Sequence, residues 1–545
     1  MSNVVKTQKV NFVDIDKIRH VSDENEILES YIDYLSDESK SVKGKAKALF
    51  FPANESEVAS ILAHANEQKI PVQISGARTG LTGGAVPEDA YLISMEKMNA
   101  LKGIGFDSDA GRYYFVFEAG IPLADVYRIV ENKEIDSLKG KSPEMDKVIE
   151  KYMADKKHFF PPDPTESTAQ LGGATATNAS GAMSFKYGAM REWIKGLRVV
   201  LPNGEVLDIN RGDITAENGL FKIVYSNGEE VKVKVPDYKM PETKNSAGLY
   251  AKPDMDLVDL FIGSEGILGV ITEVRIWVTE KPETTMTLMI YVPKLESALD
   301  LVDTLRDKSS GLNPTLVEFM DKHAVNILRE AKKSGTSSVQ IPDIPEDTEA
   351  IIYTQFPFKE EEMDDFYMAL MTALEKHGID MEQSWAAMDI SEFKKMKAVR
   401  HLVPEHINNT IARIKQKYPE IHKVGTDMAV PNEHLRTFIN YYIENLESSG
   451  LEYVMFGHIG SNHLHVNIIP KNPEEQDRAW ELYMKFIKKA VELGGTVSAE
   501  HGIGKLKKEF LKVMYGDKIH QIAEVKRVFD PNWILNPDVM IEVPS

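Results

Sequence analysis

The chain has 545 residues, which at roughly 100 to 200 residues per domain is long enough for two to four domains. Hydrophobic residues make up 42% of the chain and charged residues 27%, as in ordinary globular proteins, so the composition excludes a disordered or fibrous design. The net charge of −20 argues against nucleic acid as a partner, because a strongly acidic protein repels phosphates.

The sequence contains no cysteine, which excludes disulfides, thiolate catalysis, cysteine-ligated iron–sulfur clusters and cysteinyl attachment of a cofactor. Redox chemistry would therefore need a bound organic cofactor or a metal with nitrogen and oxygen ligands. No run of about 18 apolar residues occurs, so no transmembrane segment is predicted, and residues 1–16 lack the apolar core of a signal peptide. We expect a cytoplasmic protein, with peripheral contact at a membrane left open.

The N-terminal half alternates predicted regular elements with small-residue loops. Residues 54–75 predict a capped helix followed by a strand, and residues 103–126 predict a strand followed by a helix. Asn203-Gly204 suits the turn of a hairpin. Residues 131–158 are expected to form a solvated insertion, and residues 211–250 a polar surface excursion.

The pattern changes after residue 280 to strands and helices in alternation, which indicates an α+β antiparallel sheet with helices on one side. A long helix is predicted over residues 473–493. We therefore divide the chain into an N-terminal lead (1–45), a first domain (46–280, with insertions near 131–158 and 211–250), a second domain (281–515) and a C-terminal segment (516–545).

Two loops rich in small residues, 75–87 and 161–181, are candidates for binding an anion. Glycine lets backbone N–H groups approach a phosphate and permits positive φ angles. The spacing matches neither the G-x-G-x-x-G fingerprint nor the P-loop, so a nicotinamide Rossmann domain or an NTPase is not supported. One such loop is more often structural, but two of them together with residues 263–266 favour a large dinucleotide held by the backbone.

Histidines and a glutamate in the C-terminal half form a candidate metal site. His458 and His465 are seven residues apart and would lie on opposite faces of one straight strand, but the turn expected at residues 460–462 lets both face one point. Glu500 would complete a set that suits Zn²⁺, Mn²⁺ or Fe²⁺. The alternative is that these histidines satisfy hydrogen bonds in a core; three histidines within eight residues favour the metal.

Two further residues are candidates for chemistry. His501 adjoins Glu500 and is the natural proton acceptor, because imidazole titrates nearest to neutral pH. Arg400 is a candidate to bind a carboxylate through its guanidinium fork, although an isolated arginine is more often a surface residue.

These motifs together resemble the flavin-linked D-2-hydroxy acid dehydrogenases, which include D-lactate and D-2-hydroxyglutarate dehydrogenases and the FAD subunit of glycolate oxidase. The resemblance covers about residues 45–542. It rests on SGARTGLTGGAVP, PPDPTESTAQLGGATATNASG, GSEGILGVITE, VEFMD, GHIGSNHLHVN, SAEHGIGKLK and FDPNWILNP. It implies an α+β protein with an FAD-binding domain of the vanillyl-alcohol-oxidase or PCMH type, followed by an α+β cap domain with an antiparallel sheet.

The resemblance also assigns site residues. His458, His465 and Glu500 fall on the family's metal ligands, His501 on its catalytic base and Arg400 on its substrate-carboxylate arginine. The FAD pyrophosphate would lie on the loop of Gly76, Ala77, Arg78, Thr79 and Gly80, and the rest of FAD would contact Pro164, Gly173, Asn178, Gly181, Gly188, Glu265, Ile271 and Asn536.

The chain departs from the family pattern at several places. Ser461-Asn462-His463 stands where relatives usually have Asp-Gly-Asn, so His463 is an extra or alternative ligand. Ala77 and Arg78 replace glycine in the pyrophosphate loop. Gly425 stands where relatives often have a lysine, which removes a second cation for substrate. No histidine occupies the glycine-rich loop, so we expect non-covalent FAD.

The leading hypothesis is oxidation of a small D-2-hydroxy acid to a 2-oxo acid, with His501 accepting the hydroxyl proton and hydride passing to flavin N5. Absence of the second cation favours D-lactate or a similar monocarboxylate over a dicarboxylate such as D-2-hydroxyglutarate, and D-2-hydroxyglutarate and glycolate are kept as alternative substrates. Competing hypotheses are a non-redox transferase resembling alkylglycerone-phosphate synthases and the FAD subunit of a larger electron-transfer complex. The electron acceptor would be a quinone, a cytochrome, an electron-transferring flavoprotein or a separate iron–sulfur subunit. A homodimer is compatible with the sequence, which leaves the oligomeric state open.

Overall fold

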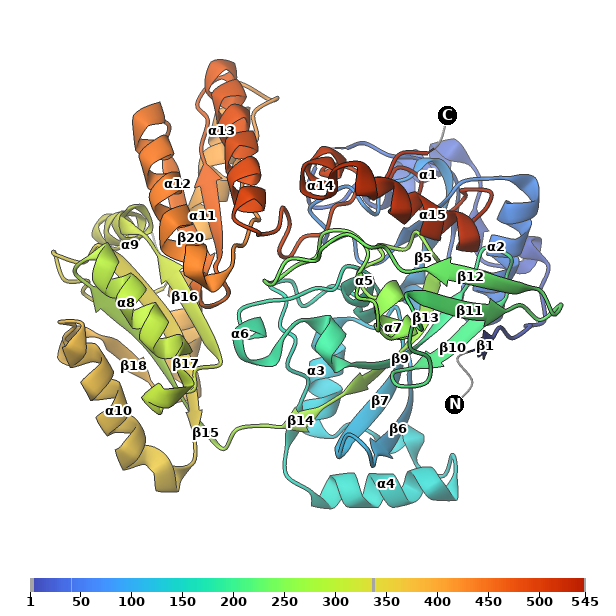
Figure 1. Cartoon of the computed structure of the whole chain (residues 1–545), viewed down its shortest axis with the longest axis horizontal. Helices are drawn as coiled ribbons and strands as arrows, with labels where there is room; N and C mark the ends of the chain where they lie inside the picture. The colour runs from blue at the N-terminus through green and yellow to red at the C-terminus, as the bar shows by residue number, and fades with distance from the viewer. Residues whose placement is uncertain (1–3, 41, 336–338, 544–545) are drawn as a thin grey trace.

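The computed structural model describes residues 4–40, 42–335 and 339–543, which form two lobes (Figure 1). The first lobe holds the chain up to β14 (Thr279–Glu280), and the second begins at β15 (Thr284–Val292) and continues through α13 (Pro473–Glu492). The chain then returns, so that α14 (Lys508–Tyr515) and α15 (His520–Phe529) lie beside the first lobe. The segment between α13 and α14 therefore crosses from one lobe to the other.

Two main sheets build the first lobe. The smaller has the order β2-β3-β5-β4, with parallel pairing of β5 to both β3 and β4. The larger is antiparallel, with the order β10-β9-β13-β7-β6. The strand bounds are β2 His20–Val21, β3 Lys45–Phe50, β4 Val72–Ser75, β5 Glu88–Ser94, β6 Leu101–Asp107, β7 Arg112–Glu118, β9 Ile194–Val200, β10 Val206–Asn210 and β13 Val270–Trp277.

The helices of the first lobe confirm the elements expected in its sequence. In α2 the side chain of Asn54 caps the helix by accepting the N–H of Glu57 at 3.0 Å, and Val58, Ile61 and Leu62 are fully buried. The turn at Gly204, with φ 81°, joins β9 to β10 as predicted. Helix bounds are α1 Glu24–Ser30, α2 Glu55–Gln68, α3 Leu123–Asn132, α4 Pro143–Ala154, α5 Leu171–Ala176, α6 Ser184–Tyr187 and α7 Leu257–Phe261.

The two stretches expected to be solvated are folded into the lobe. Helix α4 contacts β6 and buries Ile149 and Tyr152, so residues 131–158 are not solvated throughout. Residues 211–250 include β11 (Leu220–Val224) and β12 (Glu230–Lys234), which pair with each other, and β11 also pairs with β1 (Val4–Lys6). The apolar residues spaced along these charged stretches are enough to anchor each of them to the core.

A seven-stranded antiparallel sheet forms the centre of the second lobe, with the order β18-β15-β17-β16-β20-β21-β19. The further strand bounds are β16 Leu316–Met320, β17 Ala350–Phe358, β18 Trp385–Ala387, β19 Val424–Gly425, β20 Tyr453–His458 and β21 His463–Ile468. This sheet, together with the sheets and helices of the first lobe, confirms the α+β fold class expected from the sequence.

Helices cover both faces of this sheet, not one face as the sequence suggested. Alternate strand residues pack in two separate apolar clusters: one includes α8 (Leu295–Arg306), α10 (Met363–Lys376), α12 (Leu435–Ser449) and α13, and the other includes α9 (Lys322–Ser334) and α11 (Ile390–Lys415). All five residues of β16 are buried, which a sheet solvated on one face does not allow. Within the described ranges, no helix has the length and apolar character needed to cross a bilayer.

Candidate functional site

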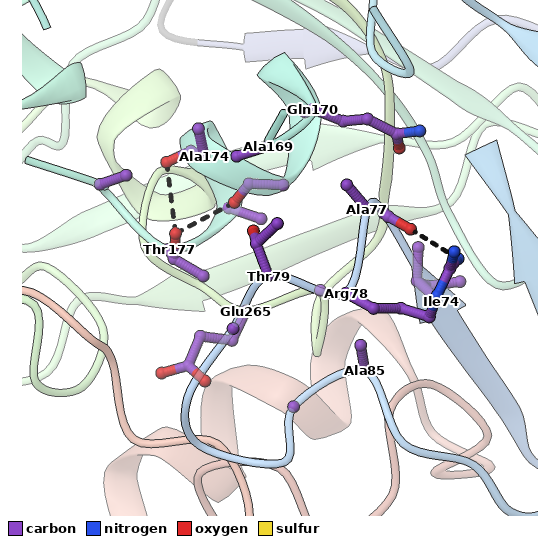
Figure 2. A pocket seen from close by; sticks show the side chains of 18 of the residues that line it. Ile74, Ala77, Arg78, Thr79, Ala85, Ala169, Gln170, Ala174, Thr177 and Glu265 are labelled. Atoms are coloured by element: carbon purple, nitrogen blue, oxygen red, sulfur yellow. Dashed lines mark hydrogen bonds between the residues drawn. The ribbon is translucent and has the colours of Figure 1, made fainter. Parts of the chain in front are cut away.

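A cavity in the first lobe is lined by the small-residue loops that the sequence analysis singled out (Figure 2). Glu500 and His501, which arrive on the segment that crosses between the lobes, also line it. Ten of the residues predicted to bind the cofactor lie on its wall: Gly76, Ala77, Arg78, Thr79, Gly80, Pro164, Gly173, Glu265, Ile271 and Asn536.

Three of the residues predicted to bind the cofactor are not among those that line this cavity. Asn178 and Gly188 line a second, polar cavity on the side of Lys244. Gly181 packs against the backbone of Asp163, where a Cβ would lie 2.0 Å from the carbonyl oxygen. This glycine is therefore required by the close approach of two chain segments.

The loop after β4 is held in place by the N-terminal lead. The N–H of Gly83 donates to Oδ2 of Asp37 at 2.7 Å, and the guanidinium of Arg78 lies 4.0 Å from the centre of the Tyr34 ring. Arg78 has a φ of 62° and donates from Nη1 to the carbonyl of Gly76 at 3.2 Å (Figure 2). The loop thus keeps the left-handed turn that glycine favours while adding a positive charge to the cavity wall.

Asn536 joins three segments at the floor of the cavity. Its Oδ1 accepts the N–H of Ile74 at 2.8 Å, and its Nδ2 donates to the carbonyl of Glu265 at 2.7 Å. The carboxyl group of Glu265 accepts the N–H groups of Ile503 and Gly504, both at 2.7 Å, and burial raises its pKa to about 7. The cavity floor and the segment carrying Glu500 are therefore one hydrogen-bonded unit.

The cavity fits a large cofactor with polar edges. Oε1 of Gln170 is buried on its wall and has no hydrogen-bond partner among the described residues, so an acceptor is left for a bound N–H donor. A Cβ built on Gly173 would meet nothing within 4 Å, so this glycine leaves open space at the wall. Both observations agree with the expectation of FAD.

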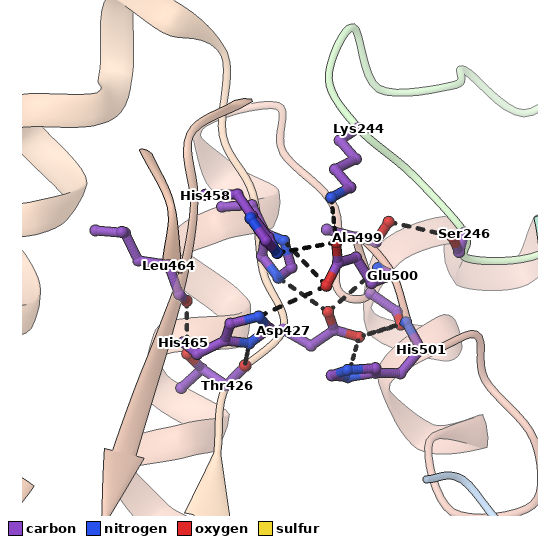
Figure 3. Close-up of polar contacts among 12 residues, drawn as sticks. Lys244, Ser246, Thr426, Asp427, His458, Leu464, His465, Ala499, Glu500 and His501 are labelled. Atoms are coloured by element: carbon purple, nitrogen blue, oxygen red, sulfur yellow. Dashed lines mark hydrogen bonds and ion pairs between the residues drawn. The ribbon is translucent and has the colours of Figure 1, made fainter. Parts of the chain in front are cut away.

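The candidate metal cluster is built on the hairpin of β20 and β21. His458 ends β20 and pairs with His463, which begins β21, across the turn at residues 459–462. Asn462 has a φ of 55°, which closes this turn. Ligand atoms of His458, His463, His465 and Glu500 all lie within 4.8 Å of one another (Figure 3 labels three of the four).

One nitrogen of each of the three imidazoles lies near the carboxylate of Glu500. Nδ1 of His465 lies 3.2 Å from the carbonyl oxygen of Thr426, which leaves Nε2 facing Glu500 at 3.6 Å. Nε2 of His458 lies 3.3 Å from Glu500, and Nδ1 of His463 lies 3.8 Å from it. Imidazole nitrogens and a carboxylate are the donor set that Zn²⁺, Mn²⁺ and Fe²⁺ accept, so the residues fit a divalent ion.

Charges of alternating sign run through the site. Arg400 pairs with Glu318, whose Oε1 lies 3.0 Å from Nδ1 of His458, and His458 in turn contacts Glu500, which pairs with Lys244. Burial alone would raise the pKa of Glu318, but the charge of Arg400 and the His458 contact lower it to about 2. Burial would likewise lower the pKa of His458, yet Glu500 and Glu318 raise it to about 9.

Asp427 is the central polar residue that sequence reasoning did not assign. It is 1% exposed, and its carboxylate lies 3.3 Å from Nδ1 of His501, 3.0 Å from Nε2 of His463 and 2.6 Å from Nζ of Lys507. Ser498 also donates to it at 2.6 Å. Despite burial, these partners hold its pKa well below the usual range. An acidic residue within an otherwise apolar stretch was the sequence signal for it.

Arg400 lies in helix α11, where a proline one turn later removes a backbone hydrogen bond. Pro404 lies four residues later in α11 and lacks the N–H that would donate to the carbonyl of Arg400. Nε and Nη2 of Arg400 both donate to Glu318. Its guanidinium is therefore bound to a buried carboxylate of the protein itself, next to the predicted metal ligands.

Lys244 is a second cation that the sequence analysis did not assign to the site. It reaches Glu500 from residues 235–250, which follow β12 in the stretch expected to be a surface excursion (Figure 3). Nothing in its local sequence distinguishes it from the exposed lysines nearby, because only the packing of one lobe against the other brings it to Glu500.

Comparison with known proteins places the chain in a family. A family model for the C-terminal domain of FAD-linked oxidases matches residues 281–540, and an FAD binding domain model matches residues 46–136 and 144–210. The D-lactate dehydrogenase of Anaerostipes hadrus is 30% identical over 537 residues, which cover 96% of both chains. The chain belongs to the FAD-linked oxidase family and is an oxidoreductase of that family, which confirms the resemblance drawn from its motifs.

Other relatives carry different substrate names. The D-2-hydroxyglutarate dehydrogenase of Stutzerimonas stutzeri is 26% identical over 96% of this chain and 97% of its own, and the glycolate oxidase subunit GlcD of Bacillus subtilis is 25% identical over 93% and 91%. A solved alkyldihydroxyacetonephosphate synthase superposes with a TM-score of 0.62 at 15% identity, covering 97% of this chain and 88% of that one. The structural likeness shows a shared fold.

Proposed function

We propose that this protein is an FAD- and divalent-metal-dependent dehydrogenase that oxidises a small D-2-hydroxy acid to the corresponding 2-oxo acid, with a D-lactate-like substrate favoured. The observation that carries the proposal is the position of Glu500 and His501. These two neighbours line the cavity that fits FAD, while Glu500 also belongs to the cluster of possible metal ligands. A substrate bound at this point would meet a redox cofactor, a Lewis acid and a base.

The loop of residues 76–80, together with Gln170 and Asn536, would hold FAD, which supplies the hydride acceptor for the reaction. His458, His465 and Glu500, with His463 as a fourth donor, would hold the metal, which supplies Lewis-acid polarisation of the substrate oxygens. Electrons would then leave to a separate acceptor. We expect FAD to be bound without a covalent link, because no histidine or cysteine stands in the glycine-rich loop.

His501 is the base in this proposal. Asp427 lies 3.3 Å from its Nδ1, which fixes that nitrogen as the protonated one and leaves Nε2 to accept the hydroxyl proton of the substrate. The carboxylate of Asp427 also stabilises the imidazolium formed by that transfer. His501 is about one-third exposed, as its position on the cavity wall requires, whereas Asp427 is buried.

Two observations favour a monocarboxylate substrate. Gly425 has no side chain that could carry a positive charge. Nε and Nη2 of Arg400 both donate to Glu318 of the protein itself. The relative at 30% identity is named a D-lactate dehydrogenase. A second carboxylate, as in D-2-hydroxyglutarate, would require a further cation at this position.

A non-redox transferase is the competing function, since a solved alkyldihydroxyacetonephosphate synthase shares the fold. The cluster of three histidines and one glutamate argues against it, because a transfer without net oxidation leaves this Lewis-acid site without a role. The alternative of an FAD subunit within a larger complex concerns the partner that takes the electrons, and it is compatible with the same active site.

The test is anaerobic reduction of the flavin, followed by its absorbance, with a panel of D- and L-2-hydroxy acids, before and after removal of metal by a chelator. We expect bleaching by small D-2-hydroxy acids, loss of bleaching after chelation and recovery when a divalent ion is added back. The His501→Ala variant should keep its flavin and lose the bleaching. Equal bleaching in the chelated protein or in this variant would refute the proposed mechanism.

A further inference from the structure

Lys244 lies on a part of the chain that neither family match covers, since those matches end at residue 210 and resume at residue 281. The two residues that follow it are hydrogen-bonded to the segment that carries Glu500. Oγ of Ser246 donates to the carbonyl of Ala499 at 3.1 Å (Figure 3). The N–H of Ser246 donates to the carbonyl of Ser498 at 2.9 Å, and Asn245 accepts from Thr496 at 2.5 Å. These hydrogen bonds fix the backbone next to Lys244 beside the segment that carries Glu500.

The ammonium of Lys244 is buried next to a single carboxylate. Its side chain is 8% exposed, and its Nζ contacts Oε1 of Glu500 and lies 3.4 Å from the carbonyl oxygen of Gly181. Among the residues that the structure describes, no other acidic side chain forms an ion pair with it. A buried ammonium is costly without a counter-charge, so its stability in this place depends on Glu500.

The two cations of the site are therefore not equivalent. Arg400 donates twice to Glu318, which is not one of the four candidate metal ligands, so its counter-charge is unaffected when an ion is bound. Lys244 depends on Glu500, which is one of those ligands. A divalent ion held by Glu500 takes up the negative charge that Lys244 uses and leaves the ammonium in need of a new anion.

A 2-hydroxy acid brings such an anion to the same place. We propose that Lys244 binds the carboxylate of the substrate and is a specificity-determining residue for acids over their neutral derivatives, an inference that rests on the proposed function. The hydroxyl and the carboxylate of a 2-hydroxy acid are on adjacent carbons, so a substrate whose oxygens approach the ion at Glu500 has its carboxylate within reach of Lys244. When an ion takes up the charge of Glu500, the ammonium of Lys244 can form its ion pair with the carboxylate of the substrate instead.

The experiment compares the metal- and FAD-loaded wild type with Lys244→Met and Lys244→Gln. D-lactate and methyl D-lactate, its neutral ester, are the substrates, and pyruvate is the ligand in a binding titration followed by the flavin absorbance. We expect both variants to raise KM for D-lactate and Kd for pyruvate by about 10- to 100-fold, the range of a lost charge-assisted hydrogen bond. The values for methyl D-lactate should change little, so the preference for acid over ester falls. Lys239→Met, an exposed lysine in the same segment, is the matched control.

Other results would overturn the inference in distinguishable ways. An unchanged preference for acid over ester and an unchanged pyruvate Kd in both variants, combined with tighter metal binding, would show that Lys244 only neutralises Glu500. Absence of flavin reduction by every 2-hydroxy acid in the wild type would refute the proposed function, and the inference with it. Flavin reduction in the wild type with the same acid-to-ester ratio in the variants would refute the inference alone.

Discussion

Replacing Asp427 by Asn is the sharpest perturbation of this site, because it keeps the shape of the side chain and removes its charge. Nζ of Lys507 lies 2.6 Å from this carboxylate and is itself largely buried, and Nδ1 of His501 lies 3.3 Å away. The backbone N–H groups of Glu500 and His501 donate to it at 3.2 and 3.1 Å. The amide retains one acceptor oxygen where the carboxylate has two.

The size of the effect follows from these contacts. Lys507 loses the buried partner of its charge, and breaking a buried ion pair from one side costs about 3–5 kcal/mol in the free energy of unfolding. His501 loses the anion that fixes its Nδ1 proton and that stabilises its charged form. A positioned general base contributes about 10²- to 10⁴-fold to rate, so we expect turnover to fall within that range.

The assay measures the flavin reduction rate in a single turnover and the thermal unfolding midpoint of the same FAD-loaded preparation. Asp107→Asn is the matched control, since Asp107 accepts from Lys195 at 2.8 Å and from Trp277 at 3.1 Å, at the end of β6 and outside the site. The control should lower stability without changing the reduction rate of the folded protein. A reduction rate for Asp427→Asn within about threefold of the wild type would show that this carboxylate does not orient the base.

Three further predictions follow from buried groups. Lys526→Met leaves the fully buried Asp530 without its ion-pair partner at 2.7 Å, so the thermal unfolding midpoint should fall. FAD should also bind more weakly, because Lys526 donates to the backbone carbonyl of Leu535, next to Asn536; an unchanged Kd for FAD would contradict this. Burial raises the pKa of Asp321 to about 7, so the stability it contributes is full below about pH 4 and is lost as pH rises through 7. Asp321→Asn should therefore reduce the change of the thermal unfolding midpoint with pH between pH 5 and 8. Parallel profiles of midpoint against pH for the wild type and the variant would exclude the effect. His463→Asn should weaken metal binding by about 10- to 100-fold, measured by competition with a chromophoric chelator, whereas an unchanged affinity would limit the ligands to three.

Local sequence predicted the features whose causes are local. Asn54 and Glu57 marked the start of α2, and the paired small-residue loops predicted the cavity that the structure forms between them. A turn was expected at residues 460–462 because glycine, serine and asparagine favour turns, and the structure forms it over residues 459–462, where it brings His458 and His465 together. The motifs also identified the family, because they fix backbone and side-chain chemistry within short stretches.

The placement of helices on both faces of the second sheet could not be read from single strands. A strand such as β16 carries apolar residues on both sides, but its length is too short for periodicity to distinguish a half-buried strand from a fully buried one. The same limit applied to residues 131–158 and 211–250, where a few apolar anchors lie within highly charged stretches.

The sequence by itself determined the fold class, the family, the small-residue loops and the residue types that can hold a metal, since each depends on neighbours along the chain. Only the tertiary structure decided that Asp427 faces His501, that Arg400 is bound to Glu318 and that Lys244 meets Glu500. These contacts join residues 74 to 256 positions apart in the chain, and the contact of Lys244 with Glu500 joins the first lobe to the segment that crosses between the lobes. The strength of such electrostatic contacts depends on burial and on distance in space, so the local sequence pattern does not predict them.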